Sequence, residues 1–374
     1  MKFISSFCQV IKDNVLLFRD LVRRRLAIIL FDRKTKLFKG EEGDGCGKRF
    51  LVVRWDAKLG DSIICSWLYR EIKKNNDKNQ LIVIGNSNFK DLYESFLGGD
   101  VFYLKKRPSY RELRMLAEQM GQVDYTIHFG ERLKMRDIYF LSRLSTSHIA
   151  GIDDGLNLID IKLGERTYNK HFCEKFTTFL HLIGYQDIDS TYIIPRFPLV
   201  ESEIRSQDWA QESNTICFNP YGSGSSRKMD TEIIISVCDM MLRETNFSII
   251  LLCMREQLKE VTGIISRTMA PERMFCLPSE SISIESLFSQ LQMSIGLVSV
   301  DTATVHIASG LNLPTLAIYN SKSGEPDQNF LNWHPNNEKA DVVFTKDLSG
   351  RGVNSLSVDD FESRFKQWVK RFLS

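Results

Sequence analysis

The sequence lacks the patterns that mark several common classes of protein. Its eight cysteines are scattered singly and none forms a C-x-x-C pair, so a zinc or disulfide framework is disfavoured and a reducing cytoplasm is expected. No stretch approaches the roughly 20 apolar residues that span a bilayer. The chain does not start with an apolar region and a small-residue cleavage site, which disfavours a signal peptide. A formal net charge of +2 gives no support for binding to nucleic acid.

The first 47 residues form a basic extension. Residues 1–39 carry ten Lys or Arg against three Asp, an excess of seven positive charges. Phe, Ile, Val and Leu recur between these charges at helical spacing, which predicts an amphipathic helix. Such a helix either lies on a membrane surface or packs on the protein itself, and the sequence leaves both roles open.

Strand and helix patterns alternate from residue 48 onward, in two series separated by a stretch with two prolines. Such alternation predicts parallel sheets covered by helices. Because 374 residues are too many for one compact core, we expect an α/β protein of two Rossmann-like domains that face a central cleft. The expected parts are the basic extension (1–47), a first Rossmann-like domain (48–190), a linker (191–212), a second Rossmann-like domain (213–356), and a C-terminal helix (357–374) whose apolar face is open to packing on the first domain.

A glycine–aspartate turn follows the first apolar run of the first domain. Residues 54–72 indicate the end of a strand, a tight turn through Gly60, and a helix that begins beside Asp61. An acid in the first helical turn is common because it caps the helix or interacts favourably with the helix dipole. The alternative is a general base that takes a proton from a hydroxyl. The pattern alone favours the structural role.

A loop rich in glycine and serine follows the first strand of the second domain. Residues 219–230, NPYGSGSSRKMD, place two glycines, three serines, Arg227 and Lys228 before a helix. Backbone N–H groups, hydroxyls and cations at a helix N-terminus suit a phosphate. The loop matches neither G-x-x-x-x-G-K-[ST] nor G-x-G-x-x-G, so it does not support a P-loop ATPase or a dehydrogenase.

Polar residues also end a buried strand near residue 300. The segment VSVDTATVHIA places Asp301 and Thr302 after an apolar run, and His306 one turn later on the same helical face as Thr302. The helix N-terminus stabilises an anion, whereas Asp301 would repel a phosphate and would instead cap the helix or hold sugar hydroxyls. Ligands of open α/β sheets bind at such strand ends, so these side chains together predict a site.

Together the three segments resemble those of glycosyltransferase family 9, the heptosyltransferases that build the inner core of bacterial lipopolysaccharide. That family has a GD turn after a strand, a Gly/Ser loop with Lys or Arg, and a VDT-x-x-x-H-x-A segment. This chain has Gly60 and Asp61, GSGSSRKM and VDTATVHIA in the same order. The resemblance covers about residues 48–345, although it does not explain the stretch 321–337. It implies the GT-B fold, in which two Rossmann-like domains surround a cleft, the first holding the acceptor and the second holding the nucleotide sugar. Ala303 replaces a usual glycine, Met229 replaces a usual tryptophan, and the GD turn is one residue longer than is typical.

The resemblance implies a role for each matched position. Asp61 is expected to be the catalytic base, and Asp301 is expected to contact the hydroxyls of the donor sugar. The expected phosphate-binding residues are Ser225, Ser226, Arg227, Lys228, Thr302, Ala303 and His306. The expected nucleoside-binding residues are Glu256, Ile282 and Ser283. No metal and no cofactor is expected, because cationic side chains and the helix N-terminus would offset the charge of the leaving diphosphate.

The resemblance also implies a reaction, the inverting transfer of a heptose from ADP-heptose to the inner core of lipopolysaccharide, where the acceptor is lipid A carrying Kdo or heptose. The expected partners are the ADP-heptose donor, the core acceptor and the cytoplasmic membrane surface. The protein is expected to be cytoplasmic and peripheral on the inner face of the bacterial cytoplasmic membrane. Two alternatives stay open: another GT-B enzyme, with a different donor sugar or acting as a sugar-nucleotide epimerase, and a non-catalytic protein that binds nucleotide sugars.

Overall fold

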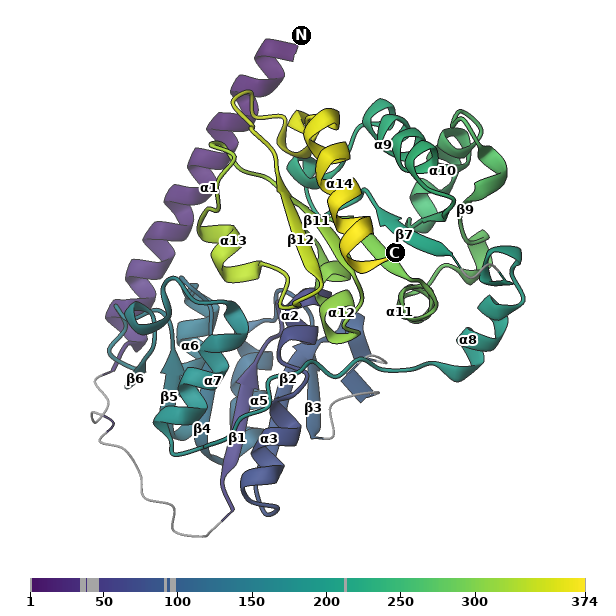
Figure 1. The fold of residues 1–374 in the computed structure, drawn as a ribbon. Helices are drawn as coiled ribbons and strands as arrows, with labels where there is room; N and C mark the ends of the chain where they lie inside the picture. The colour runs from purple at the N-terminus through teal and green to yellow at the C-terminus, as the bar shows by residue number, and fades with distance from the viewer. Residues whose placement is uncertain are drawn as a thin grey trace. The chain divides into compact units, whose positions relative to one another are not determined.

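The computed structural model describes residues 2–33, 38, 47–90, 93–94, 99–211 and 214–373, and the chain divides into two compact units (Figure 1). Unit 1 comprises Met1–Ala57 and Leu68–Ser190, and unit 2 comprises Lys58–Trp67 and Thr191–Ser374. Each unit has its own six-stranded sheet. The expected α/β architecture of two parallel-sheet domains is confirmed.

The sheet of unit 1 has the strand order β3-β2-β1-β4-β5-β6, and every neighbouring pair is parallel. Its strands are β1 (Arg49–Val53), β2 (Gln80–Asn86), β3 (Asp100–Leu104), β4 (Gln122–His128), β5 (Ser145–Gly151) and β6 (Ile161–Lys162). In the middle of the sheet Val52 pairs with Val83 on one side and Ile127 on the other. All three are buried, as expected for strands covered on both faces.

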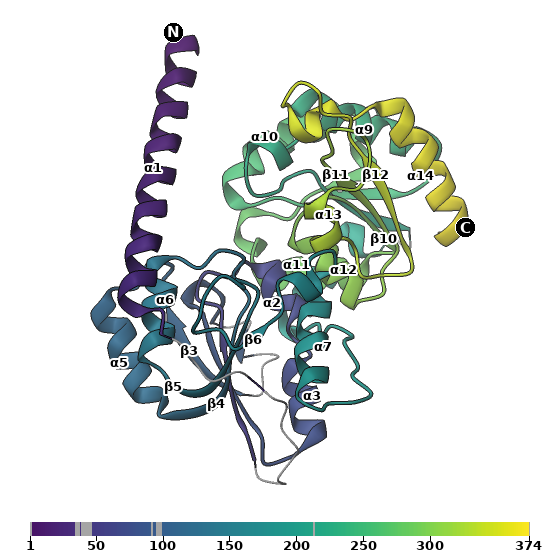
Figure 2. The same ribbon diagram turned by 90° about the vertical axis from the view of Figure 1, so that its left-hand side faces the viewer.

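Helices lie on both faces of this sheet (Figure 2). They are α3 (Leu68–Asn75), α5 (Tyr110–Met120), α6 (Met135–Arg143) and α7 (Phe172–Leu182), with the 3-10 turns η1 (Ser87–Phe89) and η2 (Glu165–Thr167). Helix α5 begins at a capping box, in which the Ser109 hydroxyl accepts from the Glu112 N–H and the Glu112 carboxylate accepts from the Ser109 N–H.

The N-terminal extension contains a long helix, α1 (Lys2–Phe31), and its last turns pack beside α6 (Figure 2). Ala27 is fully buried there, and Arg24 forms an ion pair with Asp153 at 2.8 Å. The amphipathic helix predicted from the sequence is therefore present. Among the described residues, no helix combines the length and apolarity needed to cross a membrane. The rest of the predicted extension, at residues 34–37 and 39–46, and the side chains of residues 2–14, 16 and 17 lie outside the description.

The sheet of unit 2 has the strand order β12-β11-β10-β7-β8-β9 and is also parallel throughout. Its strands are β7 (Thr215–Asn219), β8 (Ser248–Leu251), β9 (Met274–Phe275), β10 (Gly296–Val300), β11 (Thr315–Tyr319) and β12 (Ala340–Phe344). Strands β7 and β10 are neighbours, with Phe218 paired to Val298. Their carboxyl ends therefore meet at one edge of the sheet, and the two polar segments predicted as binding loops follow directly.

Unit 2 contains eight described α-helices. They are α2 (Leu59–Ile64), α8 (Pro198–Arg205), α9 (Thr231–Glu244), α10 (Leu258–Ile265), α11 (Ile284–Met293), α12 (Ala303–Gly310), α13 (Gln328–Trp333) and α14 (Val358–Phe372). Its 3-10 turns are η3 (Asp208–Gln211), η4 (Ser225–Arg227), η5 (Arg255–Gln257), η6 (Pro271–Arg273), η7 (Ser279–Ser281) and η8 (Gly352–Ser355).

The structure assigns three segments to unit 2. Helix α14 buries Phe361, Phe365 and Trp368 in the core of unit 2, whereas the sequence left open that it packs on the first domain. The segment predicted as a linker, 191–212, belongs to unit 2 and holds α8. The GD turn and α2, expected in the first domain, belong to unit 2, because α2 packs on α12. A prediction from sequence patterns assigns a segment to the domain of its neighbours in sequence, whereas packing assigns it to the domain that it contacts.

Candidate active site

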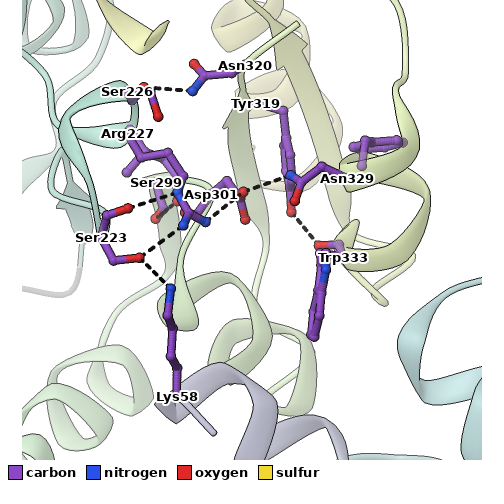
Figure 3. Close-up of polar contacts among 12 residues, drawn as sticks. Lys58, Ser223, Ser226, Arg227, Ser299, Asp301, Tyr319, Asn320, Asn329 and Trp333 are labelled. Atoms are coloured by element: carbon purple, nitrogen blue, oxygen red, sulfur yellow. Dashed lines mark hydrogen bonds and ion pairs between the residues drawn. The ribbon is translucent and has the colours of Figure 1, made fainter. Parts of the chain in front are cut away.

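Three of the predicted segments come together in unit 2 (Figure 3). The loop after β7 carries Arg227, the end of β10 carries Asp301, and the start of α2 carries Lys58. Hydrogen bonds join these elements directly, as the following contacts show. The carboxyl edge of the sheet in unit 2 is therefore a polar site to which both halves of the sequence contribute residues.

Arg227 and Asp301 form an ion pair at the centre of this site. Arg227 Nη1 lies 3.1 Å from Asp301 Oδ2, and Asn329 Nδ2 donates to the same oxygen at 3.2 Å (Figure 3). Asp301 is buried while the Arg227 side chain is 29% exposed. The guanidinium thus neutralises the carboxylate and is itself partly exposed, which reduces the repulsion between Asp301 and an anion.

The loop that carries Arg227 has a fixed shape. Gly224 has φ of 96°, a conformation that favours glycine, and an antiparallel bridge joins Tyr221 to Lys228 at the base of the loop. Asn320 Nδ2 donates to the Ser226 carbonyl at 2.7 Å (Figure 3). These contacts hold Ser225 and Ser226 at the surface, where both are exposed.

The two adjacent cations of the loop point to different partners. Arg227 contacts Asp301, whereas Lys228 Nζ lies 3.2 Å from Glu260 Oε2 and over the ring of Tyr221. Lys228 lines a pocket of about 450 Å³, a volume within the usual range for small-ligand sites. Other residues that line this pocket are Ser225, Ser226, Asp230, Glu260 and Arg351. The sequence predicted Arg227 and Lys228 in one phosphate-binding group. In the structure the two side chains contact different carboxylates.

Asp61 lies in the first turn of α2. Its Oδ2 accepts a hydrogen bond from the backbone N–H of Lys58 at 2.8 Å, as a first-turn acid does. Asp61 is partly exposed. The structural role favoured by the pattern is present, and the role as a base stays a prediction.

His306 lies under the GD turn. It is 4% exposed, and a Cβ built on Gly60 would lie 2.9 Å from its Cδ2. Its ring also meets the ring of Trp333 edge-on, with centroids 6.2 Å apart. Burial lowers the pKa of His306 to about 4, against opposing effects of Asp301 and Asp61. The imidazole is therefore neutral near pH 7 and packs α12 against α2.

Thr302 and Ala303 begin α12. Thr302 is the N-cap residue in an extended conformation, and Ala303 is the first helical residue; both are partly exposed. The backbone of Ala303 is close to Gly60, whose added Cβ would lie 3.4 Å from Ala303 Cα. The N-terminus of α12 thus lies directly beside the GD turn.

The predicted nucleoside residues occupy a neighbouring part of the same sheet edge. Glu256 is exposed in η5, after β8, and the adjacent Arg255 donates to the carbonyl of Ile282 at 3.2 Å. The Ser283 hydroxyl caps α11 by accepting from the Ser286 N–H. The structure brings these two segments to each other, and their contact with a nucleoside stays a prediction.

Sequence reasoning missed three polar residues of the site. Lys58 and Ser223 lie within segments singled out for other residues, and Asn329 lies in the stretch after β11 that the resemblance did not explain. Residue types alone gave no signal for Asn329, because its contact with Asp301 spans 28 positions.

No group of three or more His, Cys, Asp or Glu side chains in the described part of the chain is arranged to hold a metal ion. A D-x-D pattern occurs at Asp187 and Asp189, in unit 1. Asp189 forms an ion pair with Arg70 at 3.0 Å.

Comparisons with known proteins give a family. Glycosyltransferase family 9 (heptosyltransferase) matches residues 115–347. An Escherichia coli K12 protein named "Putative lipopolysaccharide heptosyltransferase 4" is 24% identical over 338 residues, which covers 85% of this chain and 87% of that protein. The solved glycosyl transferase family 9 structure from Veillonella parvula has a TM-score of 0.70 at 15% identity, and covers 89% of this chain and 100% of its own. E. coli ADP-heptose lps heptosyltransferase II has a TM-score of 0.64 at 14% identity, with 87% and 99% covered.

The two parallel-sheet units and the likeness to these solved structures define a protein of the GT-B fold. More particularly, the chain belongs to glycosyltransferase family 9, the heptosyltransferase family. The resemblance inferred from the three sequence segments is confirmed.

Proposed function

We propose that this glycosyltransferase moves a heptose from ADP-heptose to the inner core of lipopolysaccharide, with inversion at the anomeric carbon. The observation that carries the proposal is the Arg227–Asp301 pair at the carboxyl edge of the sheet, beside the N-terminus of α12. A cation that can hold a diphosphate next to a carboxylate that can hold sugar hydroxyls is what a nucleotide-sugar site requires. The names of two relatives support this donor and this acceptor. The solved E. coli enzyme is named for ADP-heptose and lps, and the E. coli K12 protein is named for lipopolysaccharide.

In this proposal Arg227 binds the diphosphate through its partly exposed guanidinium. Backbone N–H groups at Thr302 and Ala303, and the hydroxyls of Ser225 and Ser226, add further donors. Lys228, which is paired with Glu260, borders the adjacent pocket. His306, being neutral and buried, acts by holding α12 and α2 together. Glu256, Ile282 and Ser283 contact the nucleoside.

The reaction needs one base and one stabilised leaving group. Asp61 takes the proton of an acceptor hydroxyl, and that oxygen forms a bond to the anomeric carbon. The bond from this carbon to the phosphate oxygen breaks, and its electron pair leaves with ADP. Arg227 and the α12 N-terminus offset the charge that grows on ADP, so we propose that no metal or cofactor takes part.

The test is to incubate the protein with ADP-heptose and a truncated core acceptor and to weigh the product. We expect the acceptor to gain the mass of one heptose residue. Transfer from another nucleotide sugar, with none from ADP-heptose, would show that ADP-heptose is not the donor. Conversion of the donor without any acceptor would indicate an epimerase. Binding of ADP-heptose without turnover of any kind would indicate a non-catalytic protein.

We also propose that α1 holds the enzyme at the inner face of the cytoplasmic membrane, where the lipid-linked acceptor is found. One face of α1 packs on unit 1 through Arg24 and Ala27, and another exposes apolar side chains at helical spacing. The exposed apolar side chains are Val15, Phe18, Val22, Leu26, Ile29 and Leu30. Arg23 and Arg25, both exposed, flank this stripe. An apolar stripe between cations suits an anionic lipid surface.

Vesicle sedimentation tests this placement. Each basic residue near an anionic surface contributes about 1 kcal/mol, so replacing Arg23 and Arg25 by Gln should weaken binding to anionic vesicles roughly thirtyfold. Phe18→Ser should weaken it as well, and added salt should reduce the charge-dependent part. Met115→Ser removes a similarly exposed apolar side chain from α5 and serves as the matched control. Equal sedimentation of all these variants would contradict the membrane role of α1.

A further inference from the structure

Two cations converge on one hydroxyl in the proposed donor site. Lys58 Nζ lies 3.1 Å from Ser223 Oγ, and Arg227 Nη2 lies 3.0 Å from the same oxygen (Figure 3). Arg227 also donates to the Ser223 carbonyl. The arrangement links Lys58, at the start of α2, to the loop after β7 through the Ser223 hydroxyl.

The charges of the two cations are not balanced equally. Arg227 is paired with Asp301, whereas Lys58 forms no ion pair with any carboxylate among the described residues. A lysine that lies beside an arginine, and that has no carboxylate partner of its own, is repelled by the arginine. A bound anion offsets that repulsion.

The hydroxyl itself points to the same kind of ligand. A serine hydroxyl has two acceptor lone pairs and one proton. Lys58 and Arg227 donate to Ser223 Oγ and so occupy its acceptor positions. The O–H proton is then left to donate. Ser223, Lys58 and Arg227 consequently form a group of donors with a net positive charge at one exposed position, and this suits the oxygens of a diphosphate.

We propose that Lys58 is a phosphate-binding residue that contacts the diphosphate of the donor and of the leaving nucleotide. This inference rests on the proposed function, in which Arg227 binds the same diphosphate. As the bond from the anomeric carbon to the phosphate oxygen breaks, the electron pair goes to that oxygen, and the Lys58 ammonium offsets the added charge. The backbone N–H of Lys58 holds Asp61, so one turn of α2 serves both the leaving group and the base.

This role differs from that of a structural clamp. If Lys58 only tied α2 to the loop, its loss would lower stability and leave the affinity for a bare diphosphate unchanged. If it binds phosphate, its loss lowers the affinity for any diphosphate and leaves the affinity for adenosine unchanged. Measuring the affinity for a diphosphate and for adenosine therefore distinguishes the two roles.

The experiment is calorimetric titration of Lys58→Met, which keeps most of the stem, with ADP, inorganic pyrophosphate and adenosine. We expect roughly ten- to a hundredfold weaker binding of ADP and pyrophosphate, as for the loss of one charge-assisted hydrogen bond, and unchanged binding of adenosine. Lys58→Arg should recover part of the loss. Lys339→Met removes an exposed lysine of unit 2 outside the site and should bind as wild type. In turnover, Lys58→Met should lower kcat as well as raise KM for the donor.

The outcomes separate this inference from the proposed function. Lys58→Met that binds ADP and pyrophosphate within about twofold of wild type, while Arg227→Ala loses both, would overturn the role of Lys58 and leave the donor site in place. Wild type that binds pyrophosphate but not ADP would overturn the ADP donor, and the pyrophosphate affinity of Lys58→Met would still decide the role of Lys58. Wild type that binds neither would overturn both.

Discussion

Gly60 is the residue whose replacement tests the packing of α2 on α12 most directly. An alanine Cβ there would lie 2.9 Å from His306 Cδ2 and 3.4 Å from Ala303 Cα. The first distance is well below the ordinary carbon–carbon contact of about 3.5–4.0 Å. His306 is 4% exposed, so its ring has no solvent to move into. Gly60→Ala should therefore push α2 away from α12.

Two effects of opposite sign set the magnitude. Alanine in place of glycine inside a helix is favourable by about 0.5–1 kcal/mol. An extra methyl group forced into a packed site costs about 1–3 kcal/mol. The clash outweighs the helix preference, and we expect Gly60→Ala to lower the free energy of unfolding by about 1 kcal/mol. Gly263, in α10, has no atom within 4 Å of its added Cβ, so Gly263→Ala should instead raise it by about 0.5–1 kcal/mol.

Urea unfolding followed by tryptophan fluorescence measures both changes. Four of the five tryptophans, Trp67, Trp209, Trp333 and Trp368, lie in unit 2, so the signal reports mainly on that unit. Turnover of Gly60→Ala should fall by about tenfold or more, because Asp61 moves with α2. Turnover of Gly263→Ala should not change.

The double variant locates the cause. Adding His306→Ala to Gly60→Ala removes the clashing ring, so the two changes should couple favourably by about 1 kcal/mol. The reasoning would be refuted if Gly60→Ala stabilised the protein as much as Gly263→Ala does. It would also be refuted if Gly60→Ala and His306→Ala acted additively.

Three further predictions concern charge. Arg227→Ala should weaken ADP binding roughly ten- to a hundredfold, and Lys228→Ala should weaken it less because Glu260 already neutralises that lysine; titration with ADP would contradict this if the order were reversed. Asp61→Asn should abolish transfer and leave ADP affinity nearly unchanged, and transfer within about tenfold of wild type would exclude Asp61 as the base. Because burial lowers the pKa of His306 to about 4, the unfolded chain binds a proton there at a higher pH than the folded chain does. The free energy of unfolding should then fall as the pH drops from about 6.5 towards 4, and an unchanged pH dependence in His306→Gln would contradict this.

The sequence predicted the sheets and the positions of the binding loops because both depend on local patterns. Apolar runs such as residues 295–300 form strands wherever helices cover both faces, and polar residues that follow them must lie at the carboxyl edge. Asp301 and the loop with Arg227 were therefore placed at a sheet edge without any knowledge of strand order. That β7 and β10 are neighbours, which brings the two together, depends on packing between distant segments.

The direction of each side chain could not be predicted from the sequence, because it also depends on packing between distant segments. Arg227 and Lys228 are adjacent and have the same charge, yet one pairs with Asp301 and the other with Glu260. His306 was expected at the diphosphate because of its helical spacing from Thr302 and because of the resemblance. Its buried position beneath Gly60 depends on α2, which comes from the other half of the chain.

The assignment of α2 to unit 2 changes how mutations in the first half of the chain should be interpreted. Lys58, Gly60 and Asp61 precede most of unit 1 in sequence, and a sequence-based map would place them with the acceptor. Through Ser223 and His306, however, they are attached to the loop after β7 and to α12. The geometry between the proposed base and the proposed leaving-group site is therefore fixed within one compact unit. Lys58→Met should consequently behave as a donor-site variant, and an acceptor analogue should bind to it as tightly as to wild type.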